Sequence, residues 1–103
     1  MGKRLAKARG NENMSASEVT VLVGKKPAMS YVLACLISLQ QGQHVTLKAR
    51  GRSISRAVDV VQILKNRFYK DLKVQEIKLG TEMLKGQDNR DVNVSTIEIK
   101  IGS

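Results

Sequence analysis

The sequence predicts a two-layer α/β fold of the α+β kind, in which two helices cover one face of a four-stranded mixed sheet. Two segments with helical periodicity each follow a short segment that is rich in β-branched residues. Two further strand-like segments close the chain around a turn-rich tetrapeptide. The predicted order of elements is therefore β-α-β-α-β-β.

The first unit pairs a strand with a strongly apolar helix. Residues 19–23 are nearly continuously apolar, which is typical of a strand covered on both faces. After residues 24–26, Pro27 is a favoured first residue of a helix, and apolar side chains then recur over a wide arc as far as Gln41. Gly42 is a natural end of this helix.

The second unit repeats this pattern. Residues 44–49 alternate apolar and polar side chains, as a half-buried strand does. A turn at residues 50–52 follows, with Ser53 as a predicted N-cap. Apolar residues then recur at steps of one, three and four up to Phe68, which indicates an amphipathic helix.

The last two strands are predicted at residues 73–79 and 92–101, and residues 86–89 form the turn of a long hairpin. The apolar parity of the last strand changes near Ser95-Thr96, which predicts a bulge or a bend there. The first three strands should be partly parallel through right-handed crossovers, and the final hairpin should be antiparallel.

The length of 103 residues predicts one folded domain at residues 18–103, preceded by a flexible basic tail at residues 1–17. That tail either adds phosphate contacts or is simply solvated. The lone Cys35 lies in an apolar stretch and is predicted to be a buried hydrophobe in a reducing compartment. The sequence has no secretory signal and no apolar run of about 18 residues, so we expect a soluble intracellular protein with no membrane partner.

Positive charge is concentrated in the first half of the chain. The net charge is +9, and no acidic residue stands between Glu18 and Asp59. One-sided charge of this kind causes self-repulsion and is usually tolerated because the partner is a polyanion. The alternative is a basic surface kept for solubility.

Lys25 and Lys26 stand at the predicted start of the first helix, where free N–H groups already carry partial positive charge. A phosphate would resolve this conflict by accepting hydrogen bonds from the N–H groups and pairing with the ammonium groups. Two solvated lysines are the alternative. The spacing of a nucleotide-binding P-loop is absent.

A second basic cluster surrounds the start of the second helix and comprises Lys48, Arg50, Arg52 and Arg56. Parallel strands place both strand-to-helix turns at the same end of a sheet, so the two clusters should lie together as one phosphate-binding surface.

The remaining candidates leave alternatives open. The hairpin tip, with Met83, Leu84 and Arg90, could track a minor groove or could cover the sheet edge. Tyr31 could touch a nucleotide or pack in the core, and Phe68 could anchor a protein interface or cap the core. With so few aromatic rings, backbone contacts to duplexes or structured RNA are favoured over stacking on single strands.

Catalysis is not predicted. His44 is the only histidine and has no second ligand at metal-binding spacing, and no nucleophile with an adjacent base is indicated. We expect no cofactor, no metal and no small-molecule substrate.

The sequence resembles the Alba family of archaeal chromatin proteins. The resemblance rests on the following segments: residues 21–27, 31–34, 48–59, 66–68 and 94–99. It implies the fold of the C-terminal domain of bacterial translation initiation factor three, and a homodimer that binds double-stranded DNA and RNA largely without sequence preference. It also implies a cytoplasmic protein associated with the chromosome or nucleoid.

Carried over by position, the resemblance assigns nucleic-acid contacts to Lys25, Lys26, Arg50, Arg52 and Arg90. It further implies acetylation at Lys25 and a contact between dimers at Phe68. Together with Tyr31 and Lys48, which the charge and position arguments above select, these residues form the expected site.

Two other roles compete with chromatin architecture. Relatives that resemble this family serve in ribonuclease P-like particles, which would require a preference for one structured RNA. Alternatively, the basic face could bind acidic protein partners and show no duplex binding at moderate salt.

Overall fold

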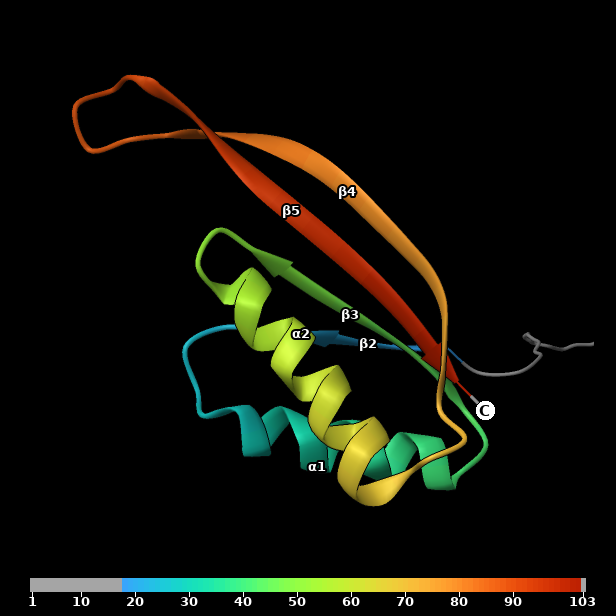
Figure 1. The fold of residues 1–103 in the computed structure, drawn as a ribbon. Coiled ribbons are helices and arrows are strands. Elements are labelled where there is room, and N and C mark those ends of the chain that lie inside the picture. Colours follow the sequence, from blue (N-terminus) through green and yellow to red (C-terminus); the bar gives the residue numbers. More distant parts are fainter. Residues whose placement is uncertain (1–17, 103) are drawn as a thin grey trace, which may run out of the picture.

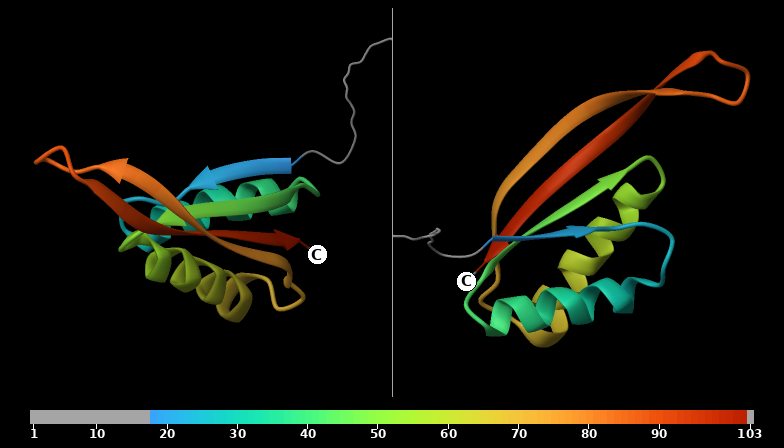
Figure 2. Two further views of the ribbon diagram at one scale, coloured as in Figure 1. Left: turned by 90° about the horizontal axis from the view of Figure 1, so that it is seen from above. Right: turned by 180° about the vertical axis from the view of Figure 1, so that it is seen from behind.

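The computed structural model describes residues 18–102. The elements are β2 (Glu18–Leu22), α1 (Ala28–Gln40), β3 (His44–Arg50), α2 (Ser53–Ile63), the π-helical turn η1 (Leu64–Phe68), β4 (Lys73–Lys85) and β5 (Asp91–Gly102) (Figure 1). The predicted order and two-layer architecture are confirmed, with both helices on one face of the sheet (Figure 2). The predicted tail at residues 1–17 lies outside the described residues.

The sheet has the strand order β2-β3-β5-β4. β2 pairs in parallel with β3, and β5 pairs antiparallel with both of its neighbours. β4 therefore runs in the same direction as β2 and β3, but β5 separates it from them. The predictions of a partly parallel set and an antiparallel final hairpin are confirmed.

The core fills the space between the two helices and the sheet. Fully buried side chains include Val32 and Cys35 of α1, Val60 of α2 and Leu47 of β3. Burying each large aliphatic side chain contributes about 1.5–3 kcal/mol, so this layer is the main stabilising feature of the domain. No helix within residues 18–102 has the length and apolarity needed to cross a bilayer.

The prediction that the first strand is covered on both faces is wrong. Exposure alternates along β2, and Leu22 is 72% exposed. The helices cover only one face of the sheet, and β2 is an edge strand, so its other face stays open in the single chain.

The hairpin is longer than predicted, since β4 extends to Lys85 and β5 begins at Asp91. The bulge predicted at Ser95-Thr96 is wrong: the register shift lies in β4, between Val74 and Glu76, and the alternative of a bend stays a prediction. β5 itself has no register shift, so Val92 and Val94 lie on the open face while Ile97, Ile99 and Ile101 face the core.

The helix ends agree with the predictions only in part. Gly42 has φ +78° and ends α1 as expected. α1 begins at Ala28, with Pro27 in the cap position. Ser53 is the first residue of α2 rather than its N-cap, and Arg52 occupies the cap without a side-chain cap bond. Because the Gly51 carbonyl accepts the Ile54 N–H (3.2 Å), the turn closes without a serine cap.

Cys35 provides a test of this core. Its side chain is fully buried, and burial raises the pKa of its thiol from 9.0 to about 12. Because the thiolate is the nucleophile, the folded protein should resist iodoacetamide at pH 8 and react only after unfolding in guanidinium, as followed by mass spectrometry. The pKa of this thiol is higher in the folded protein than in the unfolded chain. The free energy of unfolding should therefore fall as the pH rises above about 9. Rapid alkylation of the folded protein would contradict the packing described here.

Candidate nucleic-acid interface

The two basic strand-to-helix turns lie side by side. β2 and β3 are parallel neighbours, so both turns leave the sheet at the carboxyl ends of these two strands, on the left of Figure 1. The Val23 N–H donates to the Lys48 carbonyl (2.8 Å), which continues the ladder beyond β2. Arg56 Nη1 of α2 donates to the Gly24 carbonyl (2.9 Å) and ties the second helix to the first turn. The predicted juxtaposition of the two clusters is confirmed.

Tyr31 of α1 fixes the lysine loop, which we define as residues 24–27. Its ring is only 9% exposed, and its hydroxyl oxygen accepts the N–H groups of Gly24 (2.9 Å) and Lys26 (3.1 Å). A phenolic oxygen has two acceptor sites, and both are therefore used. The core-packing alternative for the ring is confirmed, while a contact between Tyr31 and nucleic acid stays a prediction.

Two N–H groups of the lysine loop already have an acceptor, while phosphate binding at the start of α1 stays a prediction. The N–H groups of Gly24 and Lys26 are engaged by Tyr31, so in this conformation they do not offer hydrogen bonds to a phosphate. The ammonium groups of Lys25 and Lys26 remain available, since both residues are exposed. The ammonium groups are therefore the part of Lys25 and Lys26 that can reach a phosphate without a change in these hydrogen bonds.

A groove opens where β2 and β3 end and the hairpin continues past them. Four predicted cations line it: Lys25, Lys48, Arg50 and Arg52. The hairpin wall contributes the carboxylates Glu82 and Glu98. We call this feature the basic groove. It brings together five of the seven predicted nucleic-acid-binding residues, since Tyr31 also lines it.

The other predicted residues lie elsewhere. Lys26 is exposed on the lysine loop beside the groove. Arg90 lies in the hairpin turn, where its guanidinium pairs with Asp88 (3.3 Å). Phe68 ends η1 and is 46% exposed. The roles predicted for Arg90 and Phe68, and acetylation at Lys25, stay predictions.

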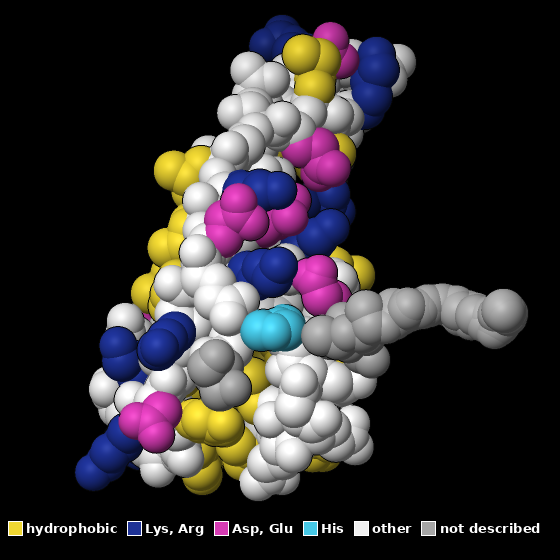
Figure 3. Space-filling model, turned by 90° about the vertical axis from the view of Figure 1, so that its right-hand side faces the viewer, with side chains coloured by type: hydrophobic (Ala, Val, Ile, Leu, Met, Phe, Trp, Pro, Cys, Tyr) yellow, Lys and Arg dark blue, Asp and Glu magenta, His cyan; other side chains and the backbone are white. Residues whose placement is uncertain are grey.

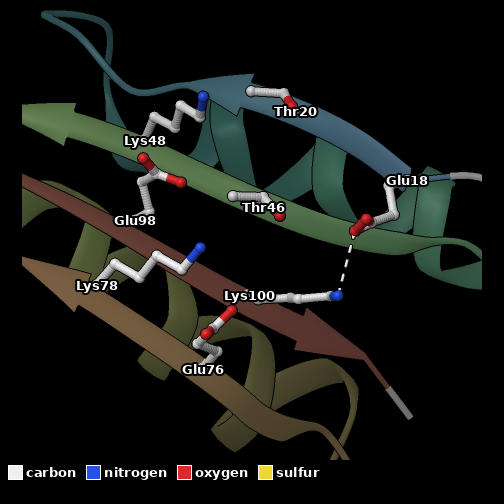
Figure 4. A pocket seen from close by; sticks show the side chains of 8 residues that line it. All are labelled: Glu18, Thr20, Thr46, Lys48, Glu76, Lys78, Glu98 and Lys100. Atoms are coloured by element: carbon white, nitrogen blue, oxygen red, sulfur yellow. Dashed lines mark ion pairs between the residues drawn. The ribbon is translucent and has the colours of Figure 1, made fainter.

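The open face of the sheet is charge-balanced rather than basic. Its cross-strand neighbours alternate in sign, and Lys48 lies beside Glu98 (Figure 4). Lys100 pairs with Glu18 (3.2 Å) at the other end of this face. Figure 3 shows basic and acidic side chains interleaved over the sheet. On this side of the sheet, Lys25, Lys26 and Arg52 of the two turns form no ion pair with any described residue.

Sequence reasoning missed Glu82 as a residue of this site. Its carboxylate pairs with Arg50 at 2.7 Å, although 32 residues separate the two in the chain. No local pattern indicates such a pair, because it depends on the strand order.

Among residues 18–102, no group of His, Cys, Asp and Glu could hold a metal ion.

Tyr31→Phe should weaken the loop without changing its charge. The variant leaves two part-buried N–H groups without their acceptor, which should cost about 1–3 kcal/mol of stability, seen as a lower midpoint in thermal unfolding. Tyr69→Phe is the matched control, since the Tyr69 hydroxyl forms no hydrogen bond within the described chain. Equal midpoints for the two variants would show that Tyr31 does not hold the loop.

Comparisons with known proteins agree with this architecture. The model of the Alba family matches residues 19–81. The structure of Alba from Thermoplasma volcanium is 44% identical, with a TM-score of 0.78, and the match covers 82% of this chain and 99% of that one. ALBA1 from Trypanosoma brucei is 26% identical, with a TM-score of 0.66, and the match covers 82% and 68% of the two chains. The chain therefore belongs to the Alba family, whose members generally bind nucleic acid.

Proposed function

We propose that this protein is a non-enzymatic, largely sequence-independent binder of double-stranded DNA and RNA, which coats, compacts or bridges nucleic acid as a homodimer. On this proposal it works in the cytoplasm in association with the chromosome. The observation that carries this proposal is that the basic turns before α1 and α2 line one groove. Arg56 of α2 connects them through its hydrogen bond to the Gly24 carbonyl.

The electrostatics of the groove suit a phosphate backbone. The N-termini of α1 and α2 carry partial positive charge, and neither helix has an acidic residue in its first turn. Exposed lysine and arginine side chains then add full charges at the same edge. Contacts of this type read phosphate rather than base sequence, which supports binding that is largely independent of sequence.

An exposed apolar strip supports the homodimer. Val74, Ile77 and Leu79 of β4 pair with the isoleucines of β5 that face the core, so they continue the apolar layer to the sheet edge. No helix covers them there, and Ile77 and Leu79 are 55% and 78% exposed. Apolar strips of this kind are typical of surfaces that a partner covers. A second copy would bury the strip.

Binding across a salt series tests the function. We expect similar affinities for two unrelated DNA duplexes and one folded RNA, measured by fluorescence anisotropy. Neutralising about six phosphates should give a log–log salt slope of about −5. Marked preference for the RNA with a shallow slope would favour a ribonucleoprotein role, as in ribonuclease P-like particles. No duplex binding at moderate salt would reject the proposal.

The lysine loop is tested in the same assay with Lys25→Ala/Lys26→Ala. Losing two phosphate contacts should flatten the slope by about 1.8 and leave the thermal midpoint nearly unchanged. The control is Lys65→Ala/Lys70→Ala, which removes the same charge from exposed residues in and after η1. Equal losses of affinity in the two variants would remove the lysine loop from the site.

Leu79→Lys should shift the protein from dimer to monomer, because a charge would be buried in the proposed contact. Sedimentation velocity at micromolar concentration measures the change. Leu22→Lys is the control, since Leu22 is similarly exposed on an edge strand but on the open face. A single-chain mass for the unaltered protein would rule out the dimer.

A further inference from the structure

The exposed cations of this protein differ in whether a carboxylate neutralises them. Within residues 18–102, three of the four ion pairs draw their acid from the hairpin: Arg50–Glu82, Lys85–Asp91 and Arg90–Asp88. In that same part of the chain, Lys25, Lys26 and Arg52 have no acidic partner. Residues 80–93 themselves carry two basic and three acidic side chains, so the hairpin adds no net positive charge.

The pair between Arg50 and Glu82 is the one that reaches into the basic groove. Arg50 ends β3 and Glu82 lies on β4, so the pair spans the intervening strand β5. At 2.7 Å it is a short, charge-assisted hydrogen bond. The two side chains are 60% and 48% exposed, so a ligand in the groove can reach both.

We propose that Glu82 competes with nucleic-acid phosphate for Arg50 and thereby lowers the affinity of the basic groove. The inference rests on the proposed function, since it concerns the same site. A phosphate that takes Arg50 Nη1 must displace Glu82 Oε1, and a phosphate that uses the other guanidinium nitrogens still lies close to a carboxylate of like charge. Both effects oppose binding and both disappear when Glu82 loses its charge.

The expected effect is modest, because exposed ion pairs are weak. Removing such a pair should tighten binding on the order of two- to five-fold at 0.1 M salt. If Arg50 becomes free to neutralise a phosphate of its own, the log–log salt slope should also steepen by up to about 0.9. Glu82 thus keeps the groove from holding nucleic acid as tightly as its cations would allow.

Glu82→Gln tests the proposal, with Glu76→Gln as the matched control. Both acids lie on the open face of β4, six residues apart, and Glu76 forms no ion pair with any described residue. Anisotropy with a 20-base-pair DNA duplex should show tighter binding for Glu82→Gln than for Glu76→Gln. In an Arg50→Ala background the extra gain from Glu82→Gln should vanish.

Three results would overturn the inference. Equal affinities of the two glutamine variants would show that only net charge matters. A gain that persists without Arg50 would show that Glu82 acts through another group. An unaltered protein that binds no duplex at all would reject the proposed function as well, whereas duplex binding with equal variants would reject this inference alone. Circular dichroism confirms that each variant folds.

Discussion

The parallel pairing of β2 with β3 is the constraint on which the rest of this structure depends. The two strands are in register from Glu18 opposite His44 to Leu22 opposite Lys48. Each strand leads into a helix on the same face of the sheet, so both helices begin at the carboxyl ends of the two strands. The pairing therefore turns two separate basic segments of sequence into one surface, which neither segment could form alone.

This placement causes electrostatic repulsion at the N-termini of the two helices. Lysine and arginine side chains crowd two helix N-termini that are themselves partly positive, and no acid stands between Glu18 and Asp59 to offset them. Tyr31 and Arg56 hold the lysine loop in place with three hydrogen bonds, so its shape does not depend on a ligand. On the proposed function, a bound polyanion would relieve the remaining repulsion, so binding and the stability of these two turns should be linked.

Features set by local pattern were predictable from the sequence. The order of helices and strands, the end of α1 at Gly42 and the burial of Cys35 follow from periodicity and from residue type. The open face of β2 was not predictable. Its continuous apolar run is typical of a strand covered on both faces, whereas helices cover only one face of this sheet. The position of the bulge near Gln75 depends on how β4 fits β5, which no single strand reveals.

The site was predictable to the extent that it is made of neighbours in sequence. The basic turns could be identified directly, and parallel strand pairing predicted that they meet. The use of Tyr31 as an acceptor and the ion pair between Arg50 and Glu82 depend on side-chain geometry across the sheet.

The central claim is that the two basic turns together form the surface that binds nucleic acid. Titrating the isotope-labelled protein with a short DNA duplex and following amide chemical shifts tests this claim. Changes concentrated at residues 24–26 and 50–53 are predicted, and changes confined to the other end of the open face, around Glu18 and Lys100, would contradict it.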